Sequence, residues 1–274
     1  DSADVWASPR LFQLNAQTAR PTAVAGVPPD YFSADGQLWG NPLYDWETHQ
    51  KTNYRWWLKR LGHSLELFDV VRIDHFRGFY DFWKIPAESP DARTGEWVKG
   101  PALDLFKTIS ERYAGAKLIA EDLGDLHMGV RDFLYKTGLP GMAVFQFGFG
   151  GDSSNAYLPH NVKENSVYYT GTHDNDTLVG WYENAPAHVQ GHVMNYLGCI
   201  KGFFLEESLR FVFESVARLA IVPAQDLLGL NASARFNTPG TMIGNWDWRM
   251  TPEQFDALNS ERLRQSLVLY GRAR

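Results

Sequence analysis

The spacing of apolar residues along the chain predicts helices that alternate with short strands. Apolar positions from Glu47 to Phe68 recur at three- and four-residue steps, the pattern of an amphipathic helix. Similar spacing predicts helices over about 102–113, 129–137 and 205–216. Short, nearly continuous apolar runs between these segments are typical of buried strands. These runs cover residues 70–73, 118–120, 142–147, 167–170 and 219–222.

This alternation favours an α/β fold with a parallel sheet, because connecting helices bury such strands on both faces. A closed (β/α)8 barrel needs eight strands, and only five can be recognised. Residues 1–46 contain many Gly, Pro and Asn breakers, so we expect loops there and no additional strand. Without a repeat or linker to divide the sequence, we expect residues 1–274 to be one portion of a catalytic barrel whose N-terminal strands are absent.

Composition and charge exclude several classes of protein. The chain has 26 Lys and Arg against 32 Asp and Glu, a net charge of −6 that argues against a nucleic-acid partner. With 44% hydrophobic and 21% charged residues, it has the composition of a soluble globular protein, and no apolar run approaches the roughly 18 residues of a membrane-spanning helix. The single cysteine, Cys199, excludes an intrachain disulfide and any Cys-based metal site. It is compatible with a reducing compartment.

Three strands run directly into carboxylates at their C-terminal ends, where parallel α/β folds bind ligands. The acids are Asp74, Glu121 and Asp174. Each could instead cap a helix or stabilise a turn, which is the interpretation that we prefer for Asp176. Together the three acids predict a site with several carboxylates.

The neighbours of these acids predict different protonation states. Arg72 lies two residues before Asp74, so a strand directs both side chains to the same face and the guanidinium keeps Asp74 ionised. A purely structural ion pair would have the same spacing. Glu121 follows an apolar strand end, where partial desolvation can raise its pKa. One ionised and one protonated carboxyl group are what glycoside chemistry needs.

Other residues support a sugar ligand. His75 and His173 each adjoin an acid, but the chain has neither an HExxH motif nor an EF-hand loop, so we expect contacts with sugar hydroxyls and no metal. Several of the ten tryptophans lie beside Gly, Asn or Asp, where an indole could stack on a sugar ring.

Five ordered segments carry a family resemblance that covers nearly the whole chain. They are residues 25–33 (AGVPPDYFS), 36–44 (GQLWGNPLY), 72–79 (RIDHFRGF), 120–124 (AEDLG) and 171–176 (GTHDND). They closely resemble the amylomaltases, the 4-α-glucanotransferase or disproportionating-enzyme family, as do residues 235–240 and 244–246.

The resemblance implies an α-amylase-type (β/α)8 barrel and a retaining double displacement on α-1,4-glucans. In this family Asp74 would be the nucleophile, Glu121 the acid and later the base, and Asp174 a ligand of ring hydroxyls. Arg72, His75 and His173 would lie at the donor sugar. Retention predicts that the carboxyl groups of Asp74 and Glu121 are about 5 to 5.5 Å apart.

The resemblance also implies residues that bind substrate away from the reacting bond. The acceptor side would use Asp30, Tyr31, Phe32, Gln37, Trp39 and Asn41. The aromatic members of this group could alternatively pack a loop onto the barrel. Asp1 matches the acid that ends the third family strand, and Asn237 and Pro239 match substrate-side positions.

The sequence therefore predicts a cytoplasmic 4-α-glucanotransferase that acts on maltooligosaccharides and on glucans from starch or glycogen, without a cofactor. An α-glucan hydrolase and an inactive glucan-binding protein remain alternatives. We expect the 274 residues alone to fold poorly and to show little activity, because unpaired strand edges would be exposed.

Overall fold

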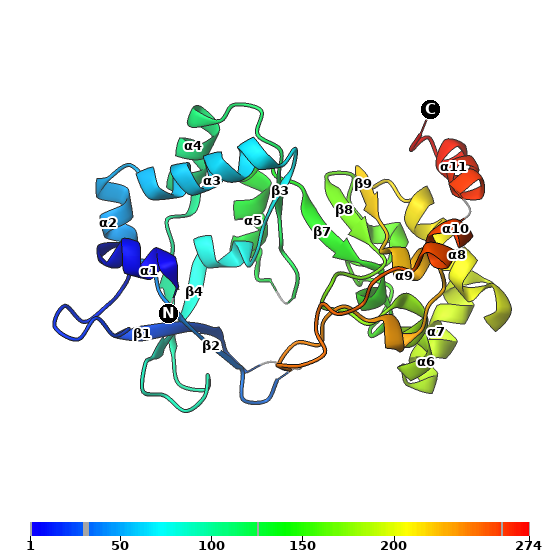
Figure 1. Ribbon diagram of the computed structural model, residues 1–274, viewed down its shortest axis with the longest axis horizontal. Coiled ribbons are helices and arrows are strands. Elements are labelled where there is room, and N and C mark those ends of the chain that lie inside the picture. The colour runs from blue at the N-terminus through cyan, green and yellow to red at the C-terminus, as the bar shows by residue number, and fades with distance from the viewer. Residues whose placement is uncertain (1, 30–32, 125, 259, 274) are drawn as a thin grey trace. The chain divides into compact units, whose positions relative to one another are not determined.

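The computed structural model describes residues 2–29, 33–124, 126–258 and 260–273. The chain divides into two compact units, Asp1–Leu139 (unit 1) and Pro140–Arg274 (unit 2) (Figure 1). Within the described residues, no helix is long and apolar enough to cross a membrane. The expectation of one barrel portion over residues 1–274 stays a prediction.

Unit 1 combines five helices and six strands among its described residues. The helices are α1 (Ala3–Ala7), α2 (Trp46–Lys51), α3 (Arg55–Leu67), α4 (Ala102–Arg112) and α5 (Met128–Thr137). The strands are β1 (Ala23–Val27), β2 (Gln37–Pro42), β3 (Val71–Ile73), β4 (Asp81–Pro86), β5 (Glu96–Lys99) and β6 (Leu118–Ala120).

The strands of unit 1 form two sheets. One is antiparallel, in the order β2-β1-β4-β5, and the other is the parallel pair β3-β6, in which Ile73 lies opposite Ala120. In Figure 1, β1 and β2 lie on the side of the unit away from α3 and α4. Phe76 and Phe133 stack with ring centroids 4.7 Å apart, in a core that includes Phe106. This core fixes the turn after β3 against α4 and α5.

Unit 2 contains one parallel sheet in the order β7-β8-β9. Its strands, β7 (Gly141–Val144), β8 (Ser166–Tyr169) and β9 (Leu219–Ile221), lie side by side in Figure 1. Tyr168, Phe145 and Phe149 are at most 1% exposed and belong to the core of this unit. The helices are α6 (Leu178–Asn184), α7 (Ala187–Leu197), α8 (Phe204–Glu214), α9 (Ala224–Leu227), α10 (Pro252–Ala257) and α11 (Ser260–Leu269).

The five strands predicted from apolar runs are confirmed as β3, β6, β7, β8 and β9, and their observed pairings are parallel. The predicted helices at 102–113, 129–137 and 205–216 are confirmed as α4, α5 and α8. The apolar spacing did not predict helices α1, α6, α7, α9, α10 and α11 or strands β4 and β5. The fold is mixed α/β, and none of the three sheets closes on itself within the described residues.

Two expectations about the first 68 residues are wrong. Residues 1–46 contain β1 and β2, which pair with each other. Strand β2 is almost wholly exposed and includes Gly40 and Pro42, so its sequence lacks the apolar alternation of a half-buried strand. The expected helix from Glu47 to Phe68 is interrupted between α2 and α3. Tyr54 has a positive φ of 52° there, and its buried side chain donates a hydrogen bond of 2.6 Å to Asp104.

Candidate active site

The three predicted acids follow the ends of parallel strands, as expected. Asp74 comes directly after β3 and Glu121 directly after β6, both in unit 1. Because β3 and β6 pair in parallel register, their C-terminal ends meet at one edge of the sheet. The pairing extends into the site: the Glu121 amide donates to the carbonyl of Ile73 at 2.9 Å. Asp174 follows β8 in unit 2.

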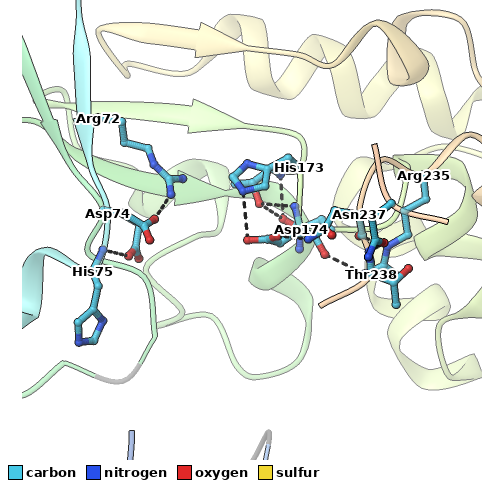
Figure 2. Close-up of polar contacts among 12 residues, drawn as sticks. Arg72, Asp74, His75, His173, Asp174, Arg235, Asn237 and Thr238 are labelled. Atoms are coloured by element: carbon cyan, nitrogen blue, oxygen red, sulfur yellow. Dashed lines mark hydrogen bonds and ion pairs between the residues drawn. The ribbon is translucent and has the colours of Figure 1, made fainter. Parts of the chain in front are cut away.

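Asp74 is an exposed carboxylate held by its neighbour on the strand. Arg72 Nη2 donates to Asp74 Oδ1 (Figure 2), which confirms that the two-residue spacing brings these side chains together. The Asp74 side chain is 77% exposed, whereas that of Arg72 is 27% exposed. The guanidinium therefore lies against the protein and leaves the carboxylate accessible to a ligand.

Glu121 occupies a different environment in the same unit. Its Oε2 accepts a hydrogen bond from the His75 amide and its Oε1 from the Leu123 amide, each at 2.8 Å. Burial raises the pKa of this carboxyl group, and the negative charge of Asp74 adds to the increase, against the lowering effect of the two amides and of Arg72. The net direction is upward, so Glu121 holds its proton to a higher pH than an ordinary glutamate.

His75 connects these two acids through its backbone. The residue has a positive φ of 46°, and its amide, which donates to Glu121, points away from its imidazole ring in Figure 2. Burial lowers the pKa of the ring, which favours the neutral imidazole. The ring packs edge-to-face against Trp39, with centroids 4.8 Å apart. Gly78 leaves room for it, because a Cβ there would lie 3.0 Å from the ring.

Strand β2 carries the acceptor-side candidates that can be described. Gln37, Trp39 and Asn41 lie along it, at a place where a register shift in the pairing with β1 and the positive φ of Gly40 (77°) interrupt the regular strand. Trp39 Nε1 donates to Gln37 Oε1 at 3.1 Å. Trp39 and Asn41 line a cavity of about 690 Å³ together with Arg72, Asp74 and His75. Four other candidates, Asp1, Asp30, Tyr31 and Phe32, lie outside the described residues.

In unit 2, Asp174 is fixed by a separate polar cluster (Figure 2). Asn237 Nδ2 donates to Asp174 Oδ1 at 2.6 Å, and His173 Nε2 lies 3.3 Å from Asp174 Oδ2. The structure therefore brings Asn237, a predicted substrate-side residue, to the acid after β8. Pro239 lies in an exposed turn closed by a hydrogen bond from the Thr241 amide to the Thr238 carbonyl.

Two residues of this cluster were not predicted as site residues. Arg235 donates to the backbone carbonyl of Asp174 at 2.8 Å and to that of Asn237 at 2.8 Å. The Trp246 ring lies 5.4 Å from that of His173, on a backbone with a positive φ of 64°. Both lie in segments that carry the family resemblance, at 235–240 and 244–246. The sequence signal that could have identified Arg235 is its position two residues before Asn237, a predicted substrate-side residue.

The arrangement in unit 1 can support acid–base and nucleophilic chemistry. The ends of two paired strands carry an exposed carboxylate beside an arginine and a partly buried carboxyl group with a raised pKa. Within the part of the chain that the structure describes, no three His, Cys, Asp or Glu side chains are grouped to hold a metal ion.

Comparisons with known proteins identify the family. A family model described as 4-alpha-glucanotransferase matches residues 1–255. The 4-alpha-glucanotransferase of Clostridium butyricum is 45% identical over an alignment of 279 positions that covers 99% of this chain and 56% of that protein. The chloroplastic/amyloplastic 4-alpha-glucanotransferase of Arabidopsis thaliana is 47% identical over an alignment of 275 positions that covers 99% of this chain and 48% of that protein.

A solved structure agrees with these matches. The amylomaltase of Streptococcus agalactiae, in complex with acarbose, superposes with a TM-score of 0.94 at 39% identity, covering 100% of this chain and 56% of that chain. The chain thus spans about half the length of the curated relatives it matches. On the family model, the sequence identities and the structural match, the chain belongs to the 4-alpha-glucanotransferase (amylomaltase) family.

Proposed function

We propose that the protein carrying this chain is a 4-α-glucanotransferase that transfers α-1,4-glucan segments between maltooligosaccharides by a retaining double displacement. The observation that supports this most directly is the contrast between two carboxyl groups at the ends of paired strands. Asp74 is exposed beside Arg72, whereas Glu121 is partly buried and has a raised pKa. A retaining glycoside reaction needs one carboxylate as nucleophile and one carboxylic acid as proton donor.

In the proposed first step, an Asp74 oxygen attacks the anomeric carbon as the bond to the leaving glucan oxygen breaks. Glu121 gives its proton to that oxygen, so the leaving chain departs as a neutral alcohol. In the second step, the Glu121 carboxylate removes the proton from the 4-hydroxyl of an acceptor glucan. That oxygen attacks the anomeric carbon, the bond to Asp74 breaks and a new α-1,4 bond forms. A separation of about 5 to 5.5 Å between the two carboxyl groups stays a prediction.

The remaining site residues take binding roles in this proposal. Asp174 binds ring hydroxyls and favours the distorted sugar, and Arg72, His75 and His173 contact the donor sugar. The acceptor is bound by Gln37, Trp39 and Asn41 together with Asp30, Tyr31 and Phe32, and Asp1, Asn237 and Pro239 also bind substrate. We further propose that the parallel strands of both units belong to a (β/α)8 barrel. No cofactor takes part.

Chain-length analysis with maltotriose tests the function. A transferase converts maltotriose into glucose and into oligosaccharides longer than the donor, whereas a hydrolase makes only shorter products. Asp74→Asn is the matched control, because it keeps the side-chain shape and removes the nucleophilic carboxylate. We expect redistribution in the wild-type protein and none in this variant. Exclusive formation of glucose and maltose would replace the proposal with α-glucan hydrolysis.

A binding measurement completes the test. The Streptococcus agalactiae relative was solved with acarbose, so we expect this protein to bind acarbose as well. Acarbose should protect Asp74→Asn against thermal unfolding as it protects the wild type. Binding without any turnover in the wild type would indicate a glucan-binding protein that lacks the reaction.

A further inference from the structure

Asp81 is a buried carboxylate that the proposed reaction does not use. It begins β4 and is 5% exposed. Arg77 Nε donates to Asp81 Oδ1 at 2.9 Å, and His127 Nε2 lies 2.9 Å from Asp81 Oδ2. Each carboxylate oxygen therefore has its own partner, and the two partners come from different loops of unit 1.

Those two loops are the ones that carry the candidate catalytic acids. Arg77 lies in the short 3₁₀ turn Phe76–Phe79, directly after Asp74 and His75. His127 ends the loop that begins with Glu121 and is the N-cap of α5. One buried carboxylate thus connects the turn after β3 with the loop after β6.

The orientation of His127 is fixed from both ends of its ring. Its Nδ1 accepts a hydrogen bond of 3.1 Å from the Gly129 amide, so the ring hydrogen is on Nε2 and is donated to Asp81. Gly129 has no room for a side chain, because a Cβ there would lie 2.5 Å from the Tyr80 hydroxyl and 3.0 Å from His127 Cε1. Two hydrogen bonds, one to each ring nitrogen, thus hold the 47% exposed His127 side chain against Asp81.

The other partner of Asp81 is also held in place. The Arg77 guanidinium lies over the Trp97 ring at 3.9 Å, and Trp97 pairs with Trp83 across β4 and β5. The Arg77 and Asp81 side chains are 18% and 7% exposed, so water screens their ion pair only weakly. Asp81 is therefore a fixed anchor against which a loop can be positioned.

We propose that the Asp81–His127 bridge positions Glu121 for proton transfer, by fixing the start of α5 and the turn that contains Arg77 to one buried carboxylate, while the His75 and Leu123 amides hold the Glu121 carboxyl group itself. This inference rests on the proposed function. His127 and Asp81 are positioning residues and touch no reacting atom. If His127 acted only as the helix cap, its bond to Gly129 would matter and its bond to Asp81 would not.

Two substitutions separate these roles. In His127→Asn, the side-chain oxygen replaces Nδ1 as acceptor for the Gly129 amide, but the shorter side chain does not reach Asp81. In His127→Gln, the side-chain amide replaces Nε2 as donor to Asp81, but glutamine is a poor N-cap. If His127 positions Glu121, His127→Asn should impair the reaction and His127→Gln should preserve it. If His127 only caps α5, His127→Gln should impair the reaction and His127→Asn should preserve it. His63→Asn, at an exposed position on α3, is the matched control.

The choice of donor shows whether Glu121 is the group affected. Maltotriose needs a proton on its leaving oxygen, whereas fluoride leaves α-maltosyl fluoride without one. For His127→Asn we expect kcat/KM on maltotriose to fall by at least about tenfold, since misplacing a catalytic group by 1 Å can cost about a hundredfold. Its kcat/KM for fluoride release should change by less than about twofold if only the acid is displaced. Equal losses on both donors, or no loss on either, would overturn the proposal.

Amide hydrogen exchange gives a readout that does not depend on turnover. The Leu123 amide is bonded to Glu121 Oε1, so loosening of the loop exposes it to exchange. Exchange of the Leu123 amide should be faster in His127→Asn and unchanged in His127→Gln, with β6 protected in both. Unchanged exchange in His127→Asn would refute the bridge even if the wild type proved to have no transferase activity. If the wild type has no transferase activity but exchange is still faster in His127→Asn than in the wild type, the bridge is retained and the proposed function is rejected.

Discussion

At the scale of single residues, the proposed reaction should depend on pH through the carboxyl group of Glu121. Burial raises the pKa of Glu121, and its protonated form is needed to release the leaving glucan. We expect kcat/KM on maltotriose to fall as the pH rises through that pKa, because the acid is then lost. The position of the alkaline limb should lie above the ordinary range of a glutamate. A pH profile of initial rates measures it.

Replacement of Glu121 tests this assignment. Glu121→Gln cannot donate a proton and should lower kcat/KM on maltotriose by about 10²- to 10⁴-fold, while fluoride release from α-maltosyl fluoride is largely kept. The remaining activity should lose the alkaline limb of its pH profile. A variant that kept this limb would show that another group supplies the proton.

The buried acid Asp226 contributes to stability with a pH dependence opposite to that of most carboxylates. It is 1% exposed, accepts hydrogen bonds from the Leu178 amide and the Thr170 hydroxyl, and its pKa is raised by burial. Because the folded pKa lies above the unfolded one, the stabilising contribution is complete below the unfolded pKa. It is lost as the pH rises through the folded pKa.

Asp226→Asn should remove this pH dependence. The asparagine oxygen can accept from Leu178, and its amide can donate to the Thr170 hydroxyl, which keeps both contacts without a buried charge. The free energy of unfolding of the variant should therefore improve relative to the wild type as the pH rises above about 4, the unfolded pKa of an aspartate. Urea titrations at several pH values would measure the difference. A constant difference would show that the pKa of Asp226 is the same in the folded and unfolded states.

At the scale of elements, strand β1 depends on a glycine that no apolar pattern would indicate. A Cβ on Gly26 would lie 2.2 Å from the Gln37 carbonyl oxygen of β2 and 2.6 Å from Ile85 Cδ1 of β4. Gly26→Ala should therefore lower the free energy of unfolding by about 1 to 3 kcal/mol, the usual cost of overpacking. Gly191→Ala is the control, because this residue lies on an exposed part of α7 with open space around its Cα. That variant should gain about 0.5 to 1 kcal/mol. Equal effects in denaturant titrations would contradict the packing argument.

The difference between buried and exposed strands explains which elements could be predicted from the sequence. Strands β3, β6, β7, β8 and β9 are short apolar runs between helical patterns, and burial alone makes them recognisable. Strand β2 is exposed and is stabilised by its pairing with β1, so its residues carry no periodic signal. At the interruption between α2 and α3, Tyr54 has a positive φ and donates a hydrogen bond to Asp104, which is 50 residues away in the sequence. Local spacing contains no information about such a contact.

Some features of the candidate site could likewise be predicted from the sequence, and others could not. The pairing of Arg72 with Asp74 followed from the period of a strand, and the raised pKa of Glu121 followed from its apolar neighbours. Arg235 reaches Asp174 across 61 residues, and Trp246 reaches His173 through a backbone with positive φ. Those two contacts depend on tertiary structure, so only the family resemblance pointed to their segments.

At the scale of the whole molecule, the net charge of −6 bears on the kind of ligand that the protein binds. A protein that neutralises several phosphates releases counterions and loses about 10³- to 10⁵-fold in affinity between about 50 and 200 mM salt. Maltooligosaccharides carry no charge, so their binding releases no such ions. We therefore expect KM for maltotriose to change by far less than tenfold over the same range of salt. Rate measurements at fixed pH would test this, with fluoride release from α-maltosyl fluoride as a second uncharged donor. A steep fall in maltotriose affinity with salt would contradict this expectation and would show that salt acts on the protein itself, because maltotriose carries no charge.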